Sequence, residues 1–597
     1  MKLKQVNRNF IWAETFVNQL YSAGIRHVCI SPGSRSTPLT IAFSKQKKIK
    51  SFVHIDERVS GFFALGLAKK SGLPTVIVTT SGTATTELYP AITEAFMQRV
   101  PLIICTADRP PELLNRGANQ TINQWNLYRN HIRFFKNIGL PQLSVNALNN
   151  LKKITLKAFD ISVVKDRGPV HLNFPFRKPL EPDSFTDEIE QEVVDCIYDS
   201  NLLTIREKKT EIISKSISKQ IDKLADKISK IENGLIIAGP LESDIGANPE
   251  VVKLARISRY PIIADGLSQL RNYKSNKVQT VCRNYDSYLR SNVFKNNYKP
   301  EIILQFGRTV TSLVLQNYIA DSGAEIFLIN KYGDVFDPSG KSKSPLKSDA
   351  KIYCSELTKK LLENDFKRGN TLWSESFRLA EEFTGRIKTD FLENSNLNFE
   401  PKAIQDCISA LPHGTRVMIG NSSPVRDLDN FVQNYPANLK LYFNRGASGI
   451  DGITSTALGI SVKGKPLVLI TGDLSFLHDL NALMPAVKYS IPMVVVSINN
   501  NGGGIFNMLP VSRDRRSFEQ FFKTPHNLNI AGIVKSFGLQ HVIIKDENNL
   551  KTKLAFAIKQ KSLTVLEIKT DAEMSSKLRQ NYWAKIVKLI DKEFTVV

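Results

Sequence analysis

The side chains best suited to chemistry lie within residues 466–506 of this 597-residue chain. Two apolar runs, 467–470 and 493–498, flank a segment of helical periodicity, which predicts strand, helix and strand. A right-handed crossover makes such strands parallel, so Asp473 and Asn500 would emerge at one sheet edge. Carboxylate and amide oxygens bind Mg²⁺ together with phosphate oxygens, and the three glycines that follow would let the backbone approach a ligand. An ordinary βαβ unit with turn-forming Asp and Asn fits the same pattern.

An earlier segment of the chain repeats this pattern. ALGLAKKSGLPTVIVTTSG, from Ala64, aligns with ALGISVKGKPLVLITGD, from Ala457, and such a repeat predicts one fold used twice. Glu57 and Ile450 both stand seven residues before the matching alanine. Glu57 follows a strand predicted over 52–55. The two copies therefore differ at a position that would face a ligand.

The predicted fold class is α/β, with three domains whose parallel sheets are flanked by helices. The chain is too long for a single core, and we expect domains at 1–185, 186–369 and 370–597. The middle domain shows short buried strands but no GxGxxG opening a helix, which disfavours dinucleotide binding and favours a Rossmann-like scaffold. A lysine-rich helix before it carries one apolar stripe, predicted to dock on a core: Ile217, Ile221, Leu224, Ile228 and Ile231.

Composition narrows the class of protein. With 42% hydrophobic and 23% charged residues the chain is globular, and it shows neither an 18-residue apolar run nor a leader pattern, so we expect a cytoplasmic protein without a membrane span. Six scattered cysteines without CxxC or nearby histidines indicate reduced thiols, not zinc ligands. The net charge of +23 is spread along helical faces, which favours a solvated basic surface over nucleic-acid binding. A non-catalytic basic binding protein remains a remote alternative.

Eight motifs in order carry a family resemblance: SPGSRSTPLT, HIDER, SGTATTELYPAITEA, TADRPPELLNRGANQTI, GNSSPVRDLD, NRGASGIDG, LITGDLSFLHDLNAL and INNNGGGIF. The chain resembles the 2-succinyl-5-enolpyruvyl-6-hydroxy-3-cyclohexene-1-carboxylate (SEPHCHC) synthases of menaquinone biosynthesis, which belong to the thiamine-diphosphate enzymes. The resemblance covers essentially the whole chain and is weakest in the middle domain.

The resemblance implies a transferase that uses thiamine diphosphate and Mg²⁺ (or Mn²⁺). It would decarboxylate 2-oxoglutarate and add the succinyl carbanion equivalent to isochorismate in a 1,4-addition. The first domain would bind the cofactor's pyrimidine and the third its diphosphate, with sites shared between subunits of a homodimer or homotetramer. Another thiamine-diphosphate enzyme acting on 2-oxo acids, such as an acetolactate synthase, is the nearest alternative, and those commonly carry flavin in the middle domain.

The same resemblance assigns catalytic and cofactor roles. Glu57 would place a carboxyl group at the pyrimidine ring, where partial burial would raise its pKa, although an acid at a helix start is also common. Ile450 would prop the cofactor in its bent conformation, although a core isoleucine is the plainer interpretation. Asp473, Asn500 and the Gly502 carbonyl would hold the metal ion. The remaining cofactor contacts would be Gly472, Ser475 and Phe506.

Both substrates are carboxylates, and guanidinium groups bind carboxylates in a bidentate manner. The resemblance assigns isochorismate to Ser34, Arg35, Arg109, Asn119 and Gln120, and the succinyl group to Ser422, Arg426 and Arg445. The middle domain departs from the family pattern, because Leu313 and Val314 stand where a basic residue is expected. Arg308 or another loop would have to supply that charge. The loop at 512–526 resembles a mobile active-site cover, or is simply a solvated loop.

Overall fold

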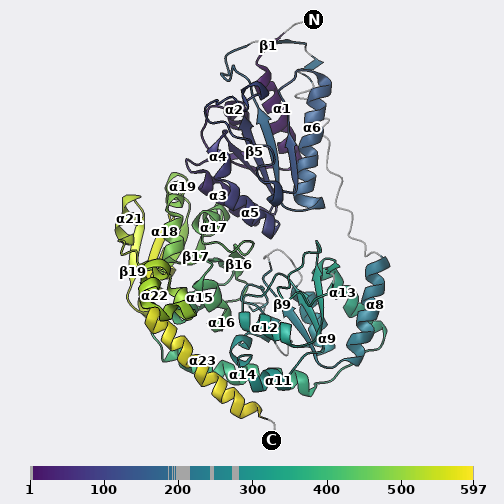
Figure 1. Ribbon diagram of the computed structural model, residues 1–597, viewed down its shortest axis with the longest axis vertical. Helices are drawn as coiled ribbons and strands as arrows, with labels where there is room; N and C mark the ends of the chain where they lie inside the picture. The colour runs from purple at the N-terminus through teal and green to yellow at the C-terminus, as the bar shows by residue number, and fades with distance from the viewer. Residues whose placement is uncertain are drawn as a thin grey trace. The chain divides into compact units, whose positions relative to one another are not determined.

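The protein is represented by a computed structural model, which describes residues 4–185, 187–190, 192–193, 195, 215–241, 248–271, 281–343 and 345–595 (Figure 1). The chain forms two compact units. The first comprises 1–208, 444–464 and 475–492, and the second comprises 209–443, 465–474 and 493–597.

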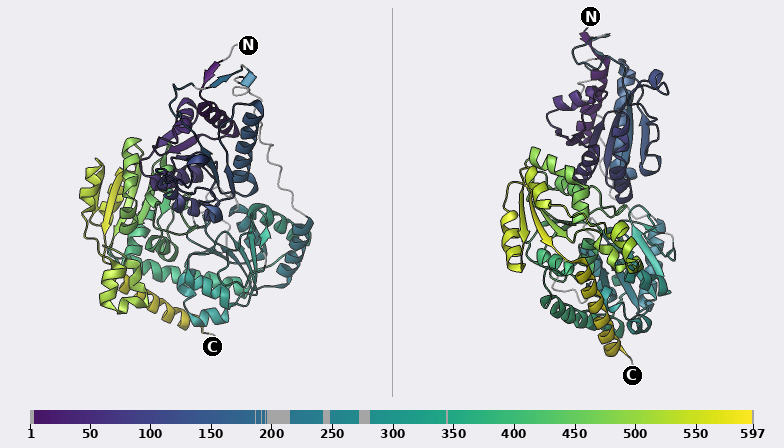
Figure 2. Two further views of the ribbon diagram at one scale, coloured as in Figure 1. Left: turned by 45° about the horizontal axis from the view of Figure 1, so that its top comes forward. Right: turned by 60° about the vertical axis from the view of Figure 1, so that its left-hand side comes forward.

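The first unit contains a parallel sheet of order β3-β2-β4-β5-β7-β6. Its strands are β2 (His27–Ile30), β3 (Lys50–Val53), β4 (Thr75–Thr79), β5 (Leu102–Asp108), β6 (Phe134–Asn137) and β7 (Pro169–Pro175). Helices cover both faces (Figure 1, Figure 2), with α1 (Arg8–Ala23), α2 (Thr37–Lys45) and α6 (Val145–Asp160) on one and α3 (Glu57–Ser71) and α5 (Tyr89–Gln98) on the other. Strands β4, β5 and β7 are buried throughout, as a sheet covered on both faces requires.

Two details of this unit differ from the sequence-based expectation. Strand β3 ends at Val53, whereas the predicted strand ran over 52–55; the apolar Ile55 that suggested the longer strand is 68% exposed. The short strand β8 (Asp187–Ile189) pairs antiparallel with β1 (Lys4–Val6), in a stretch where the charged composition gave no strand signal.

One sheet of the second unit contains the strands that precede Asp473 and Asn500. It is again parallel and has the order β16-β15-β17-β18-β20-β19. Its strands are β15 (Arg416–Ile419), β16 (Lys440–Phe443), β17 (Leu467–Gly472), β18 (Met493–Asn499), β19 (Gln540–Ile544) and β20 (Thr564–Lys569). Helices α15 (Glu400–Ser409), α16 (Ser423–Phe431) and α22 (Glu547–Ala557) share its core. The strand order matches that of the first sheet position for position, which confirms that the two terminal domains share one fold.

Equivalent glycines of the two copies meet inside the first unit. Helix α17 (Ile453–Ser461) packs on α3, and a Cβ added to Gly66 would lie 2.1 Å from the Thr456 carbonyl oxygen. Likewise a Cβ added to Gly459 would lie 2.2 Å from the Phe63 carbonyl oxygen. The repeat aligns Gly66 with Gly459, so the contact between the two helices has a local pseudo-twofold symmetry. It leaves no room for a side chain at either glycine.

The middle domain has the strand order β11-β10-β9-β12-β13-β14 in a parallel sheet. The strands are β9 (Gly234–Ala238), β10 (Ile262–Ala264), β11 (Val281–Cys282), β12 (Ile302–Phe306), β13 (Glu325–Asn330) and β14 (Leu346–Lys347). This is the Rossmann order, as the fold prediction requires. The helices that accompany it are α8 (Lys215–Lys230), α9 (Asn248–Ser258), α10 (Tyr285–Tyr288), α11 (Asn292–Asn297), α12 (Leu313–Asp321) and α13 (Ala350–Glu363).

The lysine-rich helix predicted to dock on a core is α8. Ile221, Leu224 and Ile228 are buried in the core that α9 and α13 also form, and Ile217 and Ile231 pack at its margin. The prediction of a docking helix is therefore confirmed.

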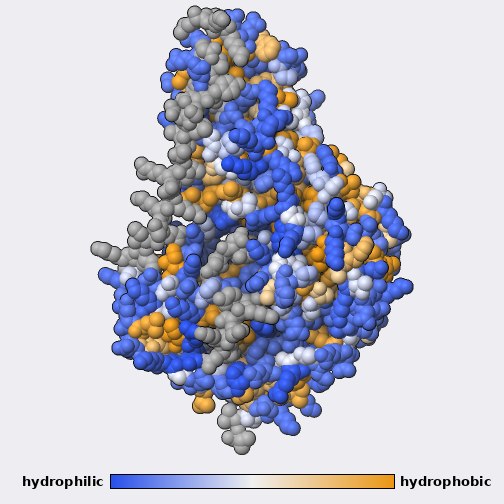
Figure 3. Space-filling model, turned by 180° about the vertical axis from the view of Figure 1, so that it is seen from behind, coloured by the Kyte–Doolittle hydropathy of each residue, from blue (hydrophilic) through white to orange (hydrophobic). Residues whose placement is uncertain are grey.

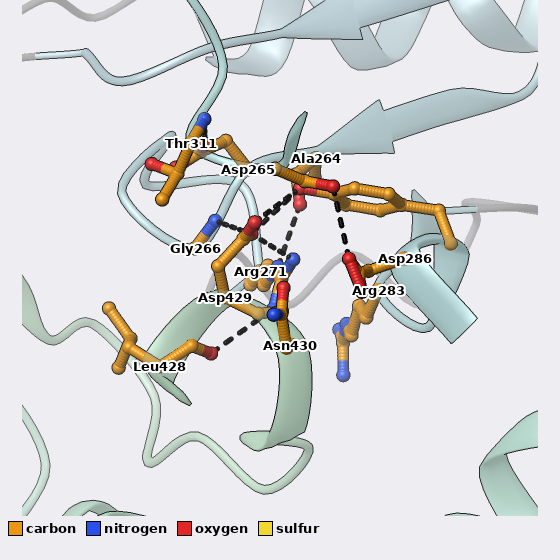
Figure 4. A network of polar contacts seen from close by, with 12 residues as sticks. Ala264, Asp265, Gly266, Arg271, Arg283, Asp286, Thr311, Leu428, Asp429 and Asn430 are labelled. Atoms are coloured by element: carbon orange, nitrogen blue, oxygen red, sulfur yellow. Dashed lines mark hydrogen bonds and ion pairs between the residues drawn. The ribbon is translucent and has the colours of Figure 1, made fainter. Parts of the chain in front are cut away.

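A buried polar network fastens α16 to the middle domain within the second unit (Figure 4). The Asp429 carboxylate accepts hydrogen bonds from Arg271 and from the N–H of Gly266, each at 2.7 Å, and from the Tyr285 hydroxyl. The side chains of Arg271 and Asp429 are each 1% exposed. Helix α14 (Leu372–Glu393) and the C-terminal helix α23 (Ala572–Phe594) pack into the adjoining core. These contacts fix the helix that begins beside Ser422.

On the face drawn in Figure 3, hydrophilic residues predominate and hydrophobic residues occur in separate small groups. Among the described helices, none is both long enough and apolar enough to cross a membrane. Five cysteines in the described ranges are buried free thiols, as predicted, and the sixth, Cys196, lies outside those ranges.

Candidate active site

Glu57 is the first residue of α3, and its side chain is half-buried. Burial is the largest cause of a raised pKa at this carboxyl, and the carboxylates of Asp56 and Glu87 act in the same direction. The shift has the direction predicted for partial burial. Asp56 caps the helix through the N–H of Arg58 and accepts a 2.7 Å hydrogen bond from the Asn481 amide. The start of α3 is therefore held from outside the helix.

Ile450 lies in the loop that precedes α17, in the same unit as Glu57. Its carbonyl oxygen accepts a 2.8 Å hydrogen bond from the Ser475 hydroxyl. The buried Asp479 carboxylate accepts from the backbone N–H and the hydroxyl of Ser455, in the first turn of α17. Two side chains thus hold the loop that presents Ile450.

Asp473 directly follows β17 in the second unit and is 2% exposed. One carboxylate oxygen accepts the N–H of Leu474 at 2.7 Å, and the other accepts the N–H of Gly502 at 2.9 Å and lies 3.3 Å from His526 Nε2. Burial raises the pKa of the Asp473 carboxyl, against the lowering effect of these N–H donors. A divalent cation beside it would favour the ionised form.

Three consecutive asparagines follow or end β18 and have different partners. Asn499 donates to Glu567 at 2.7 Å, and Asn501 donates to Asn527 at 2.8 Å. Asn500 donates from Nδ2 to Glu400, whereas its Oδ1 is buried without a hydrogen-bond partner among the described residues. Such an orphaned buried acceptor is costly unless a ligand satisfies it.

The glycine run that follows requires backbone freedom at Gly502. Its φ is +140°, and a Cβ there would lie 2.1 Å from the Lys523 carbonyl oxygen. Its own carbonyl accepts the N–H of Gly504 at 3.0 Å, which leaves one lone pair for a metal ion. The segment 512–526 contains short helical turns and contacts the run, with the N–H of Gly503 donating to Lys523 and the rings of Phe506 and Phe522 5.7 Å apart. Residues 512–526 therefore contact the glycine run. That they act as a mobile cover of the site stays a prediction.

The predicted isochorismate residues gather at the carboxyl edge of the first sheet. Ser34 and Arg35 follow β2, and Arg109 follows β5. Arg109 donates to Ser81 Oγ at 2.6 Å and to the Asn119 carbonyl at 2.7 Å. Arg35 donates from one terminal nitrogen to the Phe176 carbonyl, but its buried Nε has no partner among the described residues. Burial and, to a smaller extent, the nearby positive charge of Arg109 lower the pKa of Arg35.

Gln120 completes this group with a strained backbone. Its φ is +53°, and its carbonyl oxygen lies 3.2 Å from where a Cβ on Gly82 would stand. Asn119 and Gln120 are both exposed. The structure thus brings Arg35, Arg109 and the 119–120 loop to one edge.

The predicted succinyl-binding residues fall in two different units. Ser422 has a φ of +68° and precedes α16, and its carbonyl accepts from Arg426 at 2.7 Å. Arg445 belongs to the first unit, where the following N–H groups of Gly446 and Ala447 donate to Glu94. The structure therefore brings Ser422 and Arg426 together in the second unit. Arg445 is described with its neighbours in the first unit.

Three family descriptions match successive parts of the chain. "Thiamine pyrophosphate enzyme, N-terminal TPP binding domain" matches residues 12–127, "Middle domain of thiamine pyrophosphate" matches 205–400, and "Thiamine pyrophosphate enzyme, C-terminal TPP binding domain" matches 429–568. A SEPHCHC synthase of Haloarcula marismortui is 36% identical over 98% of this chain and 99% of its own length. That of Bacillus cytotoxicus is 36% identical over 96% of each chain. The chain belongs to the SEPHCHC synthase family.

The fold of this SEPHCHC synthase family member is that of the thiamine-diphosphate enzymes. The crystal structure of benzoylformate decarboxylase from Polynucleobacter necessarius superposes with a TM-score of 0.69, covering 94% of this chain and 99% of that one, at 15% identity. At that identity the likeness concerns the fold alone. The full-length similarity to synthases does not favour the acetolactate synthase alternative.

The residues of this family member fit the cofactor that the family binds. A buried carboxylate, an orphaned amide oxygen and a backbone carbonyl supply the hard oxygens that Mg²⁺ prefers. A Cβ added to Gly472 would meet no atom of the described residues within 4 Å, which leaves space beside Asp473 in this part of the structure. The middle domain departs from the family pattern at Leu313, where a basic residue was expected, and this leucine is 66% exposed. The guanidinium of Arg308, which could supply the charge instead, lies over the Phe336 ring at 4.8 Å.

Two neighbours of the candidate site lie outside every motif of this synthase family member. Glu400 contacts Asn500 from 100 residues away in the chain, and Gln124 contacts Gly82 from 42 residues away. Gln124 accepts the N–H of Gly82 and donates to Asn173, which fixes the loops around Arg109. An isolated glutamate or glutamine carries no motif, so only the three-dimensional contacts identify these residues.

Proposed function

We propose that this protein catalyses the thiamine-diphosphate-dependent and Mg²⁺-dependent decarboxylation of 2-oxoglutarate and the 1,4-addition of the succinyl group to isochorismate, in menaquinone biosynthesis. The observation that carries the proposal is the 36% identity, over 98% of the chain, to a relative named as a SEPHCHC synthase. When bound, thiamine diphosphate would supply a carbon acid whose deprotonated form is nucleophilic towards a 2-oxo acid, and a cationic ring able to take up the electron pair left when carbon dioxide departs.

Glu57 would hold a proton at the cofactor's pyrimidine ring. Its raised pKa supports this role, because a group that shares a proton works best when its pKa approaches the working pH. Ile450 would press on the cofactor from a loop that Ser475 holds. Phe506 and Gly472 would line the rest of the cofactor pocket.

Asp473, Asn500 and the Gly502 carbonyl would hold Mg²⁺ against the diphosphate. The supporting observations are the burial of Asp473 and the Oδ1 of Asn500, which has no hydrogen-bond partner among the residues that the structure describes. Mg²⁺ takes few protein ligands and shares its octahedron with phosphate oxygens, so three protein oxygens suffice.

The arginine-rich edge would receive the carboxylates of isochorismate. Arg35 has a buried Nε without a hydrogen-bond partner in the described part of the chain, and Arg109 is oriented by Ser81 and by the Asn119 carbonyl. A fixed planar fork of this kind favours bidentate contact with a carboxylate. Ser34 and Gln120 would add hydrogen bonds, and Ser422, Arg426 and Arg445 would bind the succinyl group.

We further propose a homodimer or homotetramer in the cytoplasm that does not bind nucleic acid. Support for the assembly comes from the family resemblance, in which the pyrimidine-binding and diphosphate-binding domains of different subunits share a site. The spread of the +23 charge without a basic block supports the absence of a nucleic-acid partner.

The test measures carbon dioxide release and isochorismate loss with 2-oxoglutarate, thiamine diphosphate and Mg²⁺. We expect both to cease without the cofactor or with a chelator, and isochorismate loss to stop when pyruvate replaces 2-oxoglutarate. Equal rates with pyruvate would refute the substrate assignment. Arg109→Lys should raise the KM for isochorismate about 10-fold or more, because a lysine cannot form the bidentate contact. Arg116→Lys, at an exposed position of the same loop, is the matched control.

A further inference from the structure

The Asn500 amide has one orientation that its surroundings accept. Its Nδ2 donates to Glu400 Oε1 at 2.7 Å, and a carboxylate only accepts hydrogen bonds. Turning the amide over would set its oxygen against the Glu400 oxygen. A Cβ on Gly504 would lie 2.3 Å from the same Nδ2, so the amide nitrogen occupies space that glycine leaves free.

Glu400 is itself held by a buried network. Its second oxygen accepts from Arg579 at 2.9 Å, and Arg579 also donates to Asp427 at 2.6 Å and to Ser575 at 2.8 Å. The Ser575 hydroxyl in turn accepts the N–H of Glu400 at 3.2 Å. The side chains of Glu400 and Arg579 are 3% and 5% exposed. Neither can turn to water, so the carboxylate has a fixed direction.

We infer that Glu400, fixed by Arg579, is a positioning residue that keeps Asn500 Oδ1 directed at the divalent cation. The inference rests on the proposed metal role of Asn500. Its basis is that Glu400 occupies the amide's donor side while the acceptor side stays buried and unpartnered among the described residues. Hydrogen-bond partners behind a metal ligand commonly orient it in this way.

The neighbouring pair provides an internal comparison. Asn499 also donates to a buried glutamate, Glu567, at 2.7 Å, and that glutamate contacts His541. Here the asparagine's Oδ1 accepts the N–H of Asn501, so it is not left open for an ion. The same substitution at Glu567 therefore disturbs a similar buried pair without reorienting a proposed ligand.

Glu400→Gln should reverse the amide of Asn500. Arg579 needs an acceptor, so it would take the new carbonyl oxygen and leave an NH₂ group facing Asn500. The asparagine would then offer its oxygen to that NH₂ and its own NH₂ to the cation. We expect the affinity for the cation to fall about 10- to 100-fold. Adding Asn500→Asp restores an acceptor on both sides and should recover affinity.

The experiment titrates the full-length protein with Mn²⁺ in the presence of thiamine diphosphate and follows free Mn²⁺ by electron paramagnetic resonance. We expect weak binding for Glu400→Gln, recovery in Glu400→Gln/Asn500→Asp, and wild-type affinity for Glu567→Gln. Wild-type affinity in Glu400→Gln, or no recovery in the double variant, would overturn the inference. Wild-type affinity in Asp473→Asn would instead overturn the proposed metal site.

If the Glu400→Gln variant does not fold, a second comparison still tests the inference. The double variant pairs an amide with a carboxylate and should fold, whereas Asn500→Asp alone sets two carboxylates against each other. If the double variant binds Mn²⁺ more tightly than Asn500→Asp alone, the inference stands. Equal or weaker binding contradicts it.

Discussion

Alanine at either glycine of the α3 and α17 crossing should damage both stability and activity. A Cβ on Gly66 would lie 2.1 Å from the Thr456 carbonyl oxygen, and one on Gly459 would lie 2.2 Å from the Phe63 carbonyl oxygen. Close carbon to carbonyl-oxygen contacts need about 3.3 Å. Since both obstacles are backbone atoms, the helices must separate by about 1 Å to admit either methyl group.

Two opposing terms decide the size of the effect. In an unconstrained helix, alanine is more stable than glycine by about 1 kcal/mol. Overpacking that moves backbone costs about 1–3 kcal/mol, so the free energy of unfolding should fall by up to about 2 kcal/mol. Glu57 begins α3, and Ile450 precedes α17. If these residues have the proposed catalytic roles, a displacement of about 1 Å between them should lower turnover about 100-fold.

We would test this expectation by measuring the thermal unfolding and the kcat of three variants: Gly66→Ala, Gly459→Ala and the double variant. One separation of the helices relieves both clashes, so the double variant should lose clearly less than the sum of the single variants. Gly369→Ala is the control, because a Cβ there meets no atom within 4 Å. Single variants as stable and active as the wild type, or strictly additive losses, would refute the close crossing.

Three further perturbations address the site. Glu57→Gln should abolish turnover while thiamine-diphosphate binding, followed by protein fluorescence, stays near wild type; wild-type turnover would contradict its proposed role. Mixing Glu57→Gln chains with Asp473→Asn chains should restore about a quarter of wild-type activity if a dimer shares its sites between subunits, and none if each site lies within one chain. Burial raises the pKa of Asp479 to about 7, and nearby Asp56 adds to the shift. Because this folded-state pKa exceeds the unfolded value, its contribution to stability is lost as pH rises through 7. Asp479→Asn should gain roughly 2–3 kcal/mol on the wild type between pH 5 and pH 8, measured by thermal unfolding, and an unchanged difference contradicts this.

The parts of the fold that were predictable are those with a continuous local signal. Strands buried on both faces are mostly apolar, so β4, β5, β17 and β18 stand out in the sequence. The repeat around Ala64 and Ala457 predicted the shared fold, because the spacing of strand, turn and helix differs by only one residue between the copies. The structure shows the same strand order in the sheets of the two terminal domains.

Elements without such a signal were missed or misplaced. The edge strands β11 and β14 contain two residues each, too few for a period to show. The end of β3 was misplaced because Ile55 is apolar yet exposed. The pairing of β1 with β8 joins residues more than 180 positions apart, and nothing local in a charged segment announces it.

The asparagines at 499–501 show why the site was only partly predictable. All three have the same side chain, and the turn after β18 exposes each to a different neighbour. Asn499 is satisfied on both sides, and Asn501 pairs with Asn527. Only Asn500 meets an acceptor on its donor side and nothing on its acceptor side among the described residues. That difference is made by Glu400, 100 residues earlier in the chain, and by the arginine that holds it. The motif therefore predicts which asparagine would bind a metal ion, whereas the contact with Glu400 that distinguishes Asn500 lies outside the motif.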